Sequence, residues 1–296
     1  MVAEMFANRV RKNARHLGKW ARRTHVTCWR VYDRDIPEVP VTVDTYDGAL
    51  VVNDYRLEQD DEAWLDAIAT AARAALDATD VFVKSRERHK GRTQYDRLAR
   101  ADAWRVVREG GHQFRVNLSD YVDTGLFLDH RDTRARVAAE GGASLLNLFA
   151  YTGAFSVYAA VAGANTTSVD LSHTYLDWAR ENLALNHVRG ELVHADAREF
   201  VVEARRARRR WDVAIVDAPT FSSSKRMDGT WDVQRDHAAL IADVQAVTAR
   251  VVWLSTNRKR FKLEVPGFTD ETRATTPPDF RHRPHFAFRA ERAARA

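Results

Sequence analysis

The chain has 296 residues and a formal net charge of +5; 45% of its residues are hydrophobic and 29% are charged. This size and composition fit one large or two modest domains, and the charge mildly favours a polyanionic partner. The single cysteine, Cys28, excludes an intrachain disulfide framework and argues against a cysteine-based metal site, and no HExxH motif occurs. No apolar run reaches membrane-spanning length and no signal core is present, so we expect a cytoplasmic protein with no membrane segment and no metal.

The first part of the chain predicts a small α+β domain. Residues 3–23 predict an amphipathic helix, because Phe6, Val10 and other apolar residues recur at helical spacing opposite a face rich in Arg and Lys. Tyr46-Asp47-Gly48 predicts a hairpin turn. The other expected elements are a helix at 61–78 and strands at 26–32, 40–46, 49–55, 81–84, 103–108 and 113–118. We therefore place a first domain at residues 1–118 and a second at residues 119–296.

Two segments of the first domain are strongly cationic. Arg11, Lys12 and Arg15 lie on the polar face of the first helix, and Arg86 and Lys90 lie in the loop after residue 84. Such runs are commonly solvated surfaces, but almost no acids interrupt the helix face, which favours contact with phosphates.

Strands and helices alternate from residue 144 onward, which predicts a parallel sheet with helices on both faces. The expected strands are 144–146, 166–169, 192–194, 211–216, 251–255, 269–275 and 285–289. The expected helices follow the turn at 147–156 and occupy 175–186, 198–210 and 237–248, with one more before residue 144.

The organising stretch of this domain is NLFAYTGAFS, residues 147–156, read together with Asp170. A strand, a tight turn, a helix and an acid at the tip of the next strand form a nucleoside-type binding unit. We expect Gly153 to let the turn backbone lie against the ligand, and Asp170 to accept the hydroxyls of a ribose. The absence of GxGxxG and GxxxxGK[ST] argues against a dinucleotide or a P-loop site, so S-adenosylmethionine is the candidate. The alternative is an ordinary strand–helix–strand turn with a surface acid.

Two further acids follow strand ends in the same way. Asp196 could accept a hydrogen bond from the adenine amine, and Asp217, followed by Pro219, could lie beside the reacting methyl group. Acids at such positions also arise simply as helix N-caps, so the ordered set carries more weight than any single member.

Several longer runs make a family resemblance visible. They are FLDHR at 127–131, NLFAYTGAFSVYAA at 147–160, VDLSHTYLDWARENLALN at 169–186, DAPTFSSSKRM at 217–227 and WDVQRDHAAL at 231–240. With FANRVRKNARHLGKWAR at 6–22 and KSRERHKGRTQY at 84–95, they resemble the class I methyltransferases of large-subunit rRNA. The likeness is strongest to the C-terminal guanine-N7 half of the bifunctional 23S rRNA guanine methyltransferase, and it spans nearly the whole chain.

The resemblance implies a Rossmann-like, seven-stranded class I methyltransferase domain, preceded by a small α+β RNA-binding domain with the basic N-terminal helix. It implies S-adenosylmethionine as donor and 23S rRNA or a large-subunit precursor as acceptor. The residues that it implies for the cofactor site are Asp129, Arg131, Phe149, Tyr151, Thr152, Gly153, Asp170, Asp196 and Asp217. Those implied for catalysis and the guanine side are Asp217, Pro219, Thr220, Phe221, Lys225 and Arg226.

Lys259 belongs to a cationic turn, 258–260, after another expected strand. It is either a phosphate clamp or a solvated turn, and we include it among the RNA-binding candidates. Phe221 is likewise either a stacking partner for the target base or a core aromatic.

The chain departs from the family pattern in two ways. Ala218 replaces the first of two prolines usual in that motif, and the N-terminal half of the bifunctional protein has no counterpart. We therefore expect a free-standing N7 half, for which a separate partner protein could supply RNA targeting.

Two other functions compete with guanine-N7 methylation. A 5-methylcytosine RNA methyltransferase would need a covalent nucleophile, typically a cysteine, and Cys28 lies far in sequence from every strand-end motif. Guanine N7 loses no proton on methylation, so alignment matters there more than a general base. A non-catalytic rRNA-binding assembly factor would keep the cofactor pocket without turnover, against which the intact series of strand-end acids argues weakly.

Overall fold

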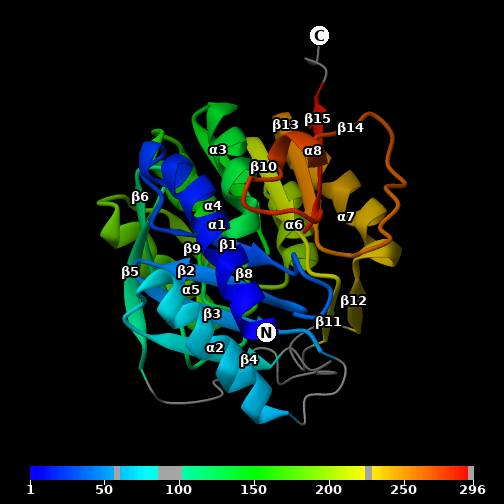
Figure 1. The fold of residues 1–296 in the computed structure, drawn as a ribbon. Coiled ribbons are helices and arrows are strands. Elements are labelled where there is room, and N and C mark those ends of the chain that lie inside the picture. The colour runs from blue at the N-terminus through cyan, green and yellow to red at the C-terminus, as the bar shows by residue number, and fades with distance from the viewer. Residues whose placement is uncertain (57–60, 86–101, 224–228, 293–296) are drawn as a thin grey trace. The chain divides into compact units, whose positions relative to one another are not determined.

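The computed structural model describes residues 1–56, 61–85, 102–223 and 229–292 (Figure 1). The chain divides into two compact units. Unit 1 comprises Met1–Leu128 and Pro278–His282, and unit 2 comprises Asp129–Pro277 and Arg283–Ala296. The two units divide after Leu128, whereas the sequence predicted a domain boundary after residue 118. In addition, the short C-terminal segment Pro278–His282 belongs to unit 1.

Unit 1 contains a four-stranded sheet of order β1-β2-β3-β4 and a separate β5–β6 ribbon. Only the β3–β4 pair of the sheet is parallel. The elements are α1 Val2–Arg23, β1 Cys28–Asp33, β2 Val41–Tyr46, β3 Ala49–Asp54, α2 Glu62–Leu76, β4 Val81–Ser85, β5 Trp104–Glu109 and β6 His112–Asn117. All of these agree with the sequence-based elements to within a few residues, because apolar periodicity and turn residues mark them clearly.

Helix α1 has the two faces that its sequence predicts. Phe6 and Val10 are fully buried in the unit 1 core with residues of β2, β3 and α2. Arg11, Lys12 and Arg15 lie on the solvent side of the helix and are exposed. The predicted hairpin is also present: Asp47 and Gly48 have φ of 50° and 89°, as a two-residue turn between antiparallel strands requires.

The returning segment 278–282 is tied to the first sheet by two carboxylates. One oxygen of Asp33 accepts the backbone N–H groups of Arg281 at 3.1 Å and His282 at 3.3 Å. Asp279 in turn accepts the backbone N–H of Arg30 at 2.9 Å. Both carboxylates are buried, so these bonds hold the segment firmly in unit 1.

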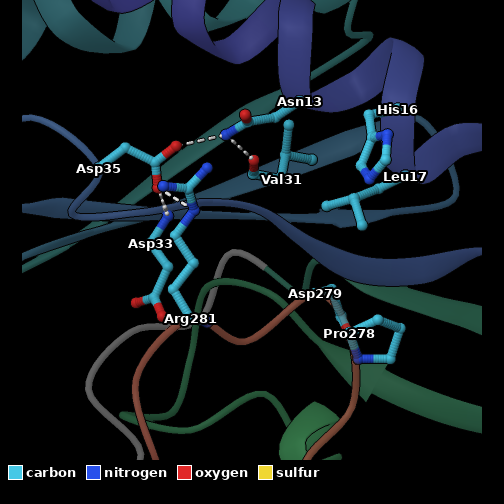
Figure 2. A pocket seen from close by; sticks show the side chains of 9 residues that line it. All are labelled: Asn13, His16, Leu17, Val31, Asp33, Asp35, Pro278, Asp279 and Arg281. Atoms are coloured by element: carbon cyan, nitrogen blue, oxygen red, sulfur yellow. Dashed lines mark hydrogen bonds and ion pairs between the residues drawn. The ribbon is translucent and has the colours of Figure 1, made fainter.

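A cavity of about 210 Å³ lies beside this junction (Figure 2). Its lining residues are Asn13, His16, Leu17, Val31, Asp33, Asp35, Pro278, Asp279 and Arg281. The side-chain amide of Asn13 donates to Asp35 at 2.6 Å and to the Val31 carbonyl at 2.9 Å, and Arg281 pairs with Asp35 at 3.2 Å. The polar groups here thus largely satisfy one another.

Unit 2 is built on a seven-stranded sheet of order β14-β15-β13-β10-β7-β8-β9. The five strands from β13 to β9 are parallel, and β15 and β14 add an antiparallel edge. The strands are β7 Ser144–Leu148, β8 Asn165–Asp170, β9 Glu191–His194, β10 Trp211–Asp217, β13 Thr248–Thr256, β14 Thr269–Asp270 and β15 Phe286–Glu291, with a small hairpin of β11 Phe221–Ser223 and β12 Thr230–Asp232. The helices are η2 Leu128–His130, α3 Arg131–Ala139, α4 Ala154–Val161, α5 His173–Leu185, α6 Ala197–Arg206, α7 Val233–Val247 and α8 Thr272–Thr275.

Alternate residues of the central strands face two separate cores, as a sheet covered on both sides requires. Leu145 of β7 packs with α3 and α4, whereas Leu146 and Leu148 pack with α6 and α7. The predicted Rossmann-like fold is therefore confirmed, and it brings the carboxyl ends of β7, β8, β9 and β10 to one edge of the sheet.

Unit 2 differs from the sequence-based expectations in two places. The expected strand at 269–275 is a strand only at Thr269–Asp270, because the short helix α8 begins at Thr272, whose N–H donates to the Asp270 carboxylate at 2.9 Å. The β11–β12 hairpin was not expected at all. Within the part of the chain that the structure describes, we find no helix both long and apolar enough to cross a membrane.

Candidate functional site

The turn between β7 and α4 has an unusual backbone. Phe149, Tyr151 and Gly153 all adopt left-handed conformations, with φ of 57°, 50° and 73°. Non-glycine residues rarely hold such angles, and they persist only where the surrounding structure enforces them. Local strain of this kind is typical of ligand-binding turns.

Asp170, at the end of β8, enforces this turn. Its carboxylate accepts the backbone N–H of Tyr151 at 2.8 Å and that of Ser172 at 2.9 Å. From the other side, the side chain of Asn182 on α5 donates to the carbonyl of Thr152 at 2.9 Å. The turn is therefore bonded to the end of β8 through Tyr151 and to α5 through Thr152.

Gly153 is needed at its position for a reason that the sequence did not show. A side chain there would place its Cβ 2.8 Å from the Cβ of Ala179 on α5, which is closer than two non-bonded carbon atoms approach each other. Packing against α5 is therefore one reason why glycine is required at this position.

The carboxyl group of Asp170 is poorly solvated, although part of the residue reaches the surface. Desolvation raises the pKa of Asp170 to about 6, and the hydrogen bonds from Ser172 and Tyr151 only partly oppose this. Each carboxylate oxygen can accept a second hydrogen bond, so two ribose hydroxyls could still bind here and stabilise the charged form.

Asp196 follows β9 and is the N-cap of α6. It accepts the backbone N–H of Arg198 at 2.7 Å and pairs with the guanidinium of Arg198 at 2.8 Å. Burial alone would raise the pKa of Asp196, but the hydrogen bonds from Arg198 outweigh it and hold the pKa below its ordinary value. Asp196 therefore caps α6, which is one of the two roles that the sequence allowed. A contact with adenine would be a second role of the same carboxylate.

Asp217, at the end of β10, is held from two sides. The hydroxyl of Ser255 on β13 donates to its Oδ1 at 2.5 Å, and Nε2 of His130 lies 3.6 Å from the same oxygen. Ala218 donates its N–H to the Ser255 carbonyl at 2.9 Å. A proline has no N–H and could not form this bond, so this hydrogen bond requires a residue other than proline at position 218.

Asp129, His130 and His285 form a cluster beside Asp217. Their donor atoms lie within 4.8 Å of one another, a spacing that a metal could bridge. However, the two imidazole rings are stacked, with centroids 4.2 Å apart, and Nδ1 of His285 already contacts Asp129 at 3.2 Å. We therefore describe it as a hydrogen-bonded cluster, in which Asp129 supports His285.

Pro219, Thr220 and Phe221 lead from β10 into the β11–β12 hairpin. The fully buried Trp231 anchors this hairpin by donating its indole N–H to the Pro219 carbonyl at 2.8 Å. The Thr220 hydroxyl donates to Asn257 at 2.6 Å. Phe221 is 50% exposed, so it is not a core aromatic.

The remaining predicted residues fall into three groups. Arg131 begins α3 and is buried. Lys259 is exposed, whereas its neighbour Arg258 pairs with Asp232, the N-cap of α7, at 2.7 Å. Arg86, Lys90, Lys225 and Arg226 lie outside the described residues.

Sequence reasoning missed His130, His285 and Ser255. His130 was visible within FLDHR but had no spacing that demanded a role. His285 and Ser255 carry no local signal, because only the sheet topology brings them to the end of β10.

A parallel sheet with acids at adjacent strand ends and a strained turn between them is the arrangement of a nucleoside-binding α/β enzyme. The chain belongs to the S-adenosylmethionine-dependent methyltransferase family, whose model matches residues 24–243. The donor for this class is therefore S-adenosylmethionine, as the sequence predicted.

Similar proteins point in the same direction. Ribosomal RNA large subunit methyltransferase K of Neisseria meningitidis serogroup B is 40% identical, over 94% of this chain and 84% of that protein. Ribosomal RNA large subunit methyltransferase K/L of Methylococcus capsulatus is 43% identical over 95% of this chain but only 41% of its own length. The chain thus spans about two fifths of the K/L relative.

A solved structure supports the fold. SMU.776, a putative methyltransferase complexed with SAH, superposes with a TM-score of 0.79 at 24% identity, covering 98% of this chain and 82% of that one.

The packing of Gly153 gives a direct stability prediction. Gly153→Ala should destabilise the protein by about 1–2 kcal/mol for the left-handed backbone and by roughly 1–3 kcal/mol more for the contact with Ala179. Gly163→Ala is the matched control, because Gly163 also has a positive φ but nothing lies within 4 Å of the place that its Cβ would occupy. Urea unfolding should show a larger loss for Gly153→Ala, partly recovered by adding Ala179→Gly; equal losses for both glycines would contradict the packing account.

Proposed function

We propose that the chain transfers a methyl group from S-adenosylmethionine to N7 of a guanine in large-subunit (23S) rRNA. The observation that carries the proposal is an anchored carboxylate at the end of β10, Asp217, followed along the chain by the exposed Phe221 at the start of the β11–β12 hairpin. The names of the relatives, which cover this chain almost completely, supply the RNA class.

In this proposal, the cofactor lies along the carboxyl ends of β7, β8 and β9. Asp170 accepts the ribose hydroxyls, and Asp196 lies on the adenine side. Phe149, Tyr151, Thr152 and Gly153 form the turn against the amino-acid and sulfonium end, over which Asp129 and Arg131 close.

The chemistry requires alignment and charge stabilisation. The lone pair of guanine N7 attacks the methyl carbon, the sulfur–carbon bond breaks, and the positive charge moves from the sulfonium to the purine. No proton has to leave, so a general base is unnecessary. The carboxylate of Asp217 would stabilise the cationic purine, and Phe221 would stack on a base that has left its helix.

The cysteine argues against a pyrimidine-C5 reaction. Such a reaction needs a covalent nucleophile, and the only cysteine, Cys28, is fully buried in unit 1 with its Sγ 3.6 Å from the Arg108 carbonyl. This is the environment of a small structural side chain.

Unit 1 would supply part of the RNA contact through α1, and Lys259 would contact phosphate near the site. A partner protein that helps to target the RNA remains a prediction.

The direct test is methyl transfer from labelled S-adenosylmethionine to unmodified 23S rRNA, followed by nucleoside mass spectrometry. We expect 7-methylguanosine. Detection of 5-methylcytosine instead would contradict the proposed acceptor. Cofactor binding without transfer to rRNA or to large-subunit precursors would favour the non-catalytic assembly role.

The raised pKa of Asp170 predicts a pH-dependent cofactor affinity. Ribose hydroxyls stabilise the charged carboxylate, so binding should lower its pKa from about 6 and release a proton near that pH. Affinity should therefore fall up to about tenfold for each pH unit below 6 and level off above 7. Calorimetry from pH 5 to 8 measures this, with Asp170→Asn as the control; a variant that kept the full pH dependence would exclude Asp170 as its source.

The exposed cations of α1 predict a salt effect. Replacing Arg11, Lys12 and Arg15 with Gln should reduce the slope of log affinity for rRNA against log salt by roughly 2 to 3, since each phosphate contact contributes about 0.7 to 0.9. A control with the same change in charge replaces Arg205, Arg206 and Arg208, which are exposed near the end of α6. Equal changes in the two variants would show an effect of net charge only.

A further inference from the structure

His130 has a defined place next to the strand-end acid Asp217. It is the last residue of η2 and precedes α3, and its side chain is buried in unit 2. Its Nε2 lies 3.6 Å from Oδ1 of Asp217, slightly beyond a hydrogen bond. Catalytic contacts are often long in a free enzyme and shorten when substrate binds.

The ring of His130 is fixed by its neighbours. It stacks on His285 with centroids 4.2 Å apart and an interplanar angle of 22°, and it meets Phe155 of α4 edge-on at 5.9 Å. His285 is itself held, because its two ring nitrogens contact Asp129 at 3.2 Å and Thr133 at 3.3 Å. The direction of Nε2 toward Asp217 is therefore set by packing.

The surroundings of His130 favour the neutral ring. Burial lowers the pKa of His130; Asp217 and Asp129 oppose this, and His285 and Arg134 add to it. These charged and titratable groups face the ring from β10, η2, α3 and the residue before β15. A neutral imidazole still carries one N–H that can be donated to a carboxylate.

The contacts of Asp217 are arranged asymmetrically. Both Ser255 on β13 and His130 on η2 approach Oδ1. The second carboxylate oxygen is the one that we expect to face the guanine. Within the part of the chain that the structure describes, removing His130 would leave Ser255 as the side chain that orients the carboxylate, and the carboxylate could then rotate about its Cβ–Cγ bond.

We propose that His130 is a positioning residue for methyl transfer: its neutral ring orients the Asp217 carboxylate toward the purine that becomes cationic. This rests on the proposed function. A protonated ring would instead offset the charge of Asp217 and weaken the stabilisation of the purine. The role differs from proton transfer, since N7 methylation moves no proton.

The kinetic test compares two replacements of His130 at saturating S-adenosylmethionine. His130→Phe keeps a flat ring but removes the N–H, and His130→Gln keeps an N–H donor near the position of Nε2. We expect His130→Phe to lower kcat at least tenfold with cofactor affinity within twofold of wild type, and His130→Gln to recover most of kcat. His187→Asn is the control, because His187 is exposed and left-handed, which asparagine tolerates. A kcat within twofold in His130→Phe, or an equal loss in both variants, would overturn the proposal.

The pH profile separates positioning from mere packing. Because burial lowers the pKa of His130, wild-type kcat should fall only at a pH below the ordinary pKa of a histidine, and His130→Gln should lack this fall. Saturating cofactor removes the contribution of Asp170, which acts on affinity. Persistence of the same fall in His130→Gln would contradict the role of this ring.

A titration that needs no activity completes the test. Histidine-labelled NMR of the free protein should show a lower pKa for His130 in Asp217→Asn than in wild type, because the carboxylate favours the charged ring. An unchanged pKa would overturn the proposed coupling. Failure of the wild type to methylate rRNA would contradict the proposed function, and the titration would then decide the His130–Asp217 coupling alone.

Discussion

The hydrogen bond from the Tyr151 N–H to the Asp170 carboxylate is the contact on which the proposed cofactor end of the site depends. It joins the turn after β7 to the end of β8 and helps to hold Phe149 and Tyr151 in backbone conformations that they would not keep alone. The same carboxylate sits in a poorly solvated position, which raises its pKa to about 6. A turn held in this way keeps backbone groups fixed before the ligand arrives, so little ordering remains for the binding step.

The proposed reacting end of the site is assembled differently. Asp217 ends β10, Ser255 comes from β13 and His130 from η2, so three elements meet at one carboxylate oxygen. Supporting contacts from separate elements restrict the orientation of a group more than a single neighbour can. The β11–β12 hairpin, which follows β10 and is anchored by Trp231, presents Phe221 to solvent. Together they provide a negative charge and an exposed aromatic ring, which suit a flipped purine that becomes positively charged.

Much of the fold could be predicted from the sequence, because alternation of strands and helices and the turns Asp47-Gly48 and 149–153 carry strong local signals. The strand-end acids could be predicted because each follows an expected strand. The features that the sequence did not predict depend on contacts between residues that lie far apart in the chain, or on local contacts that compete with strand formation. Nothing local showed that 278–282 returns to unit 1 through Asp33 and Asp279, or that His285 stacks on His130. The β-branched residues near Thr272 favoured a strand, but the chain forms a helical turn there, in which the Thr272 N–H donates to Asp270.

The central claim is that Asp170 both holds the turn and receives the ribose. A crystal structure of the protein with S-adenosylhomocysteine tests it most directly. The account predicts that the Tyr151 N–H bond to Asp170 persists while both ribose hydroxyls donate to the same carboxylate, with the sulfur facing Asp217. A ligand bound with its ribose away from Asp170, or a turn that rearranges to release Tyr151, would contradict the claim.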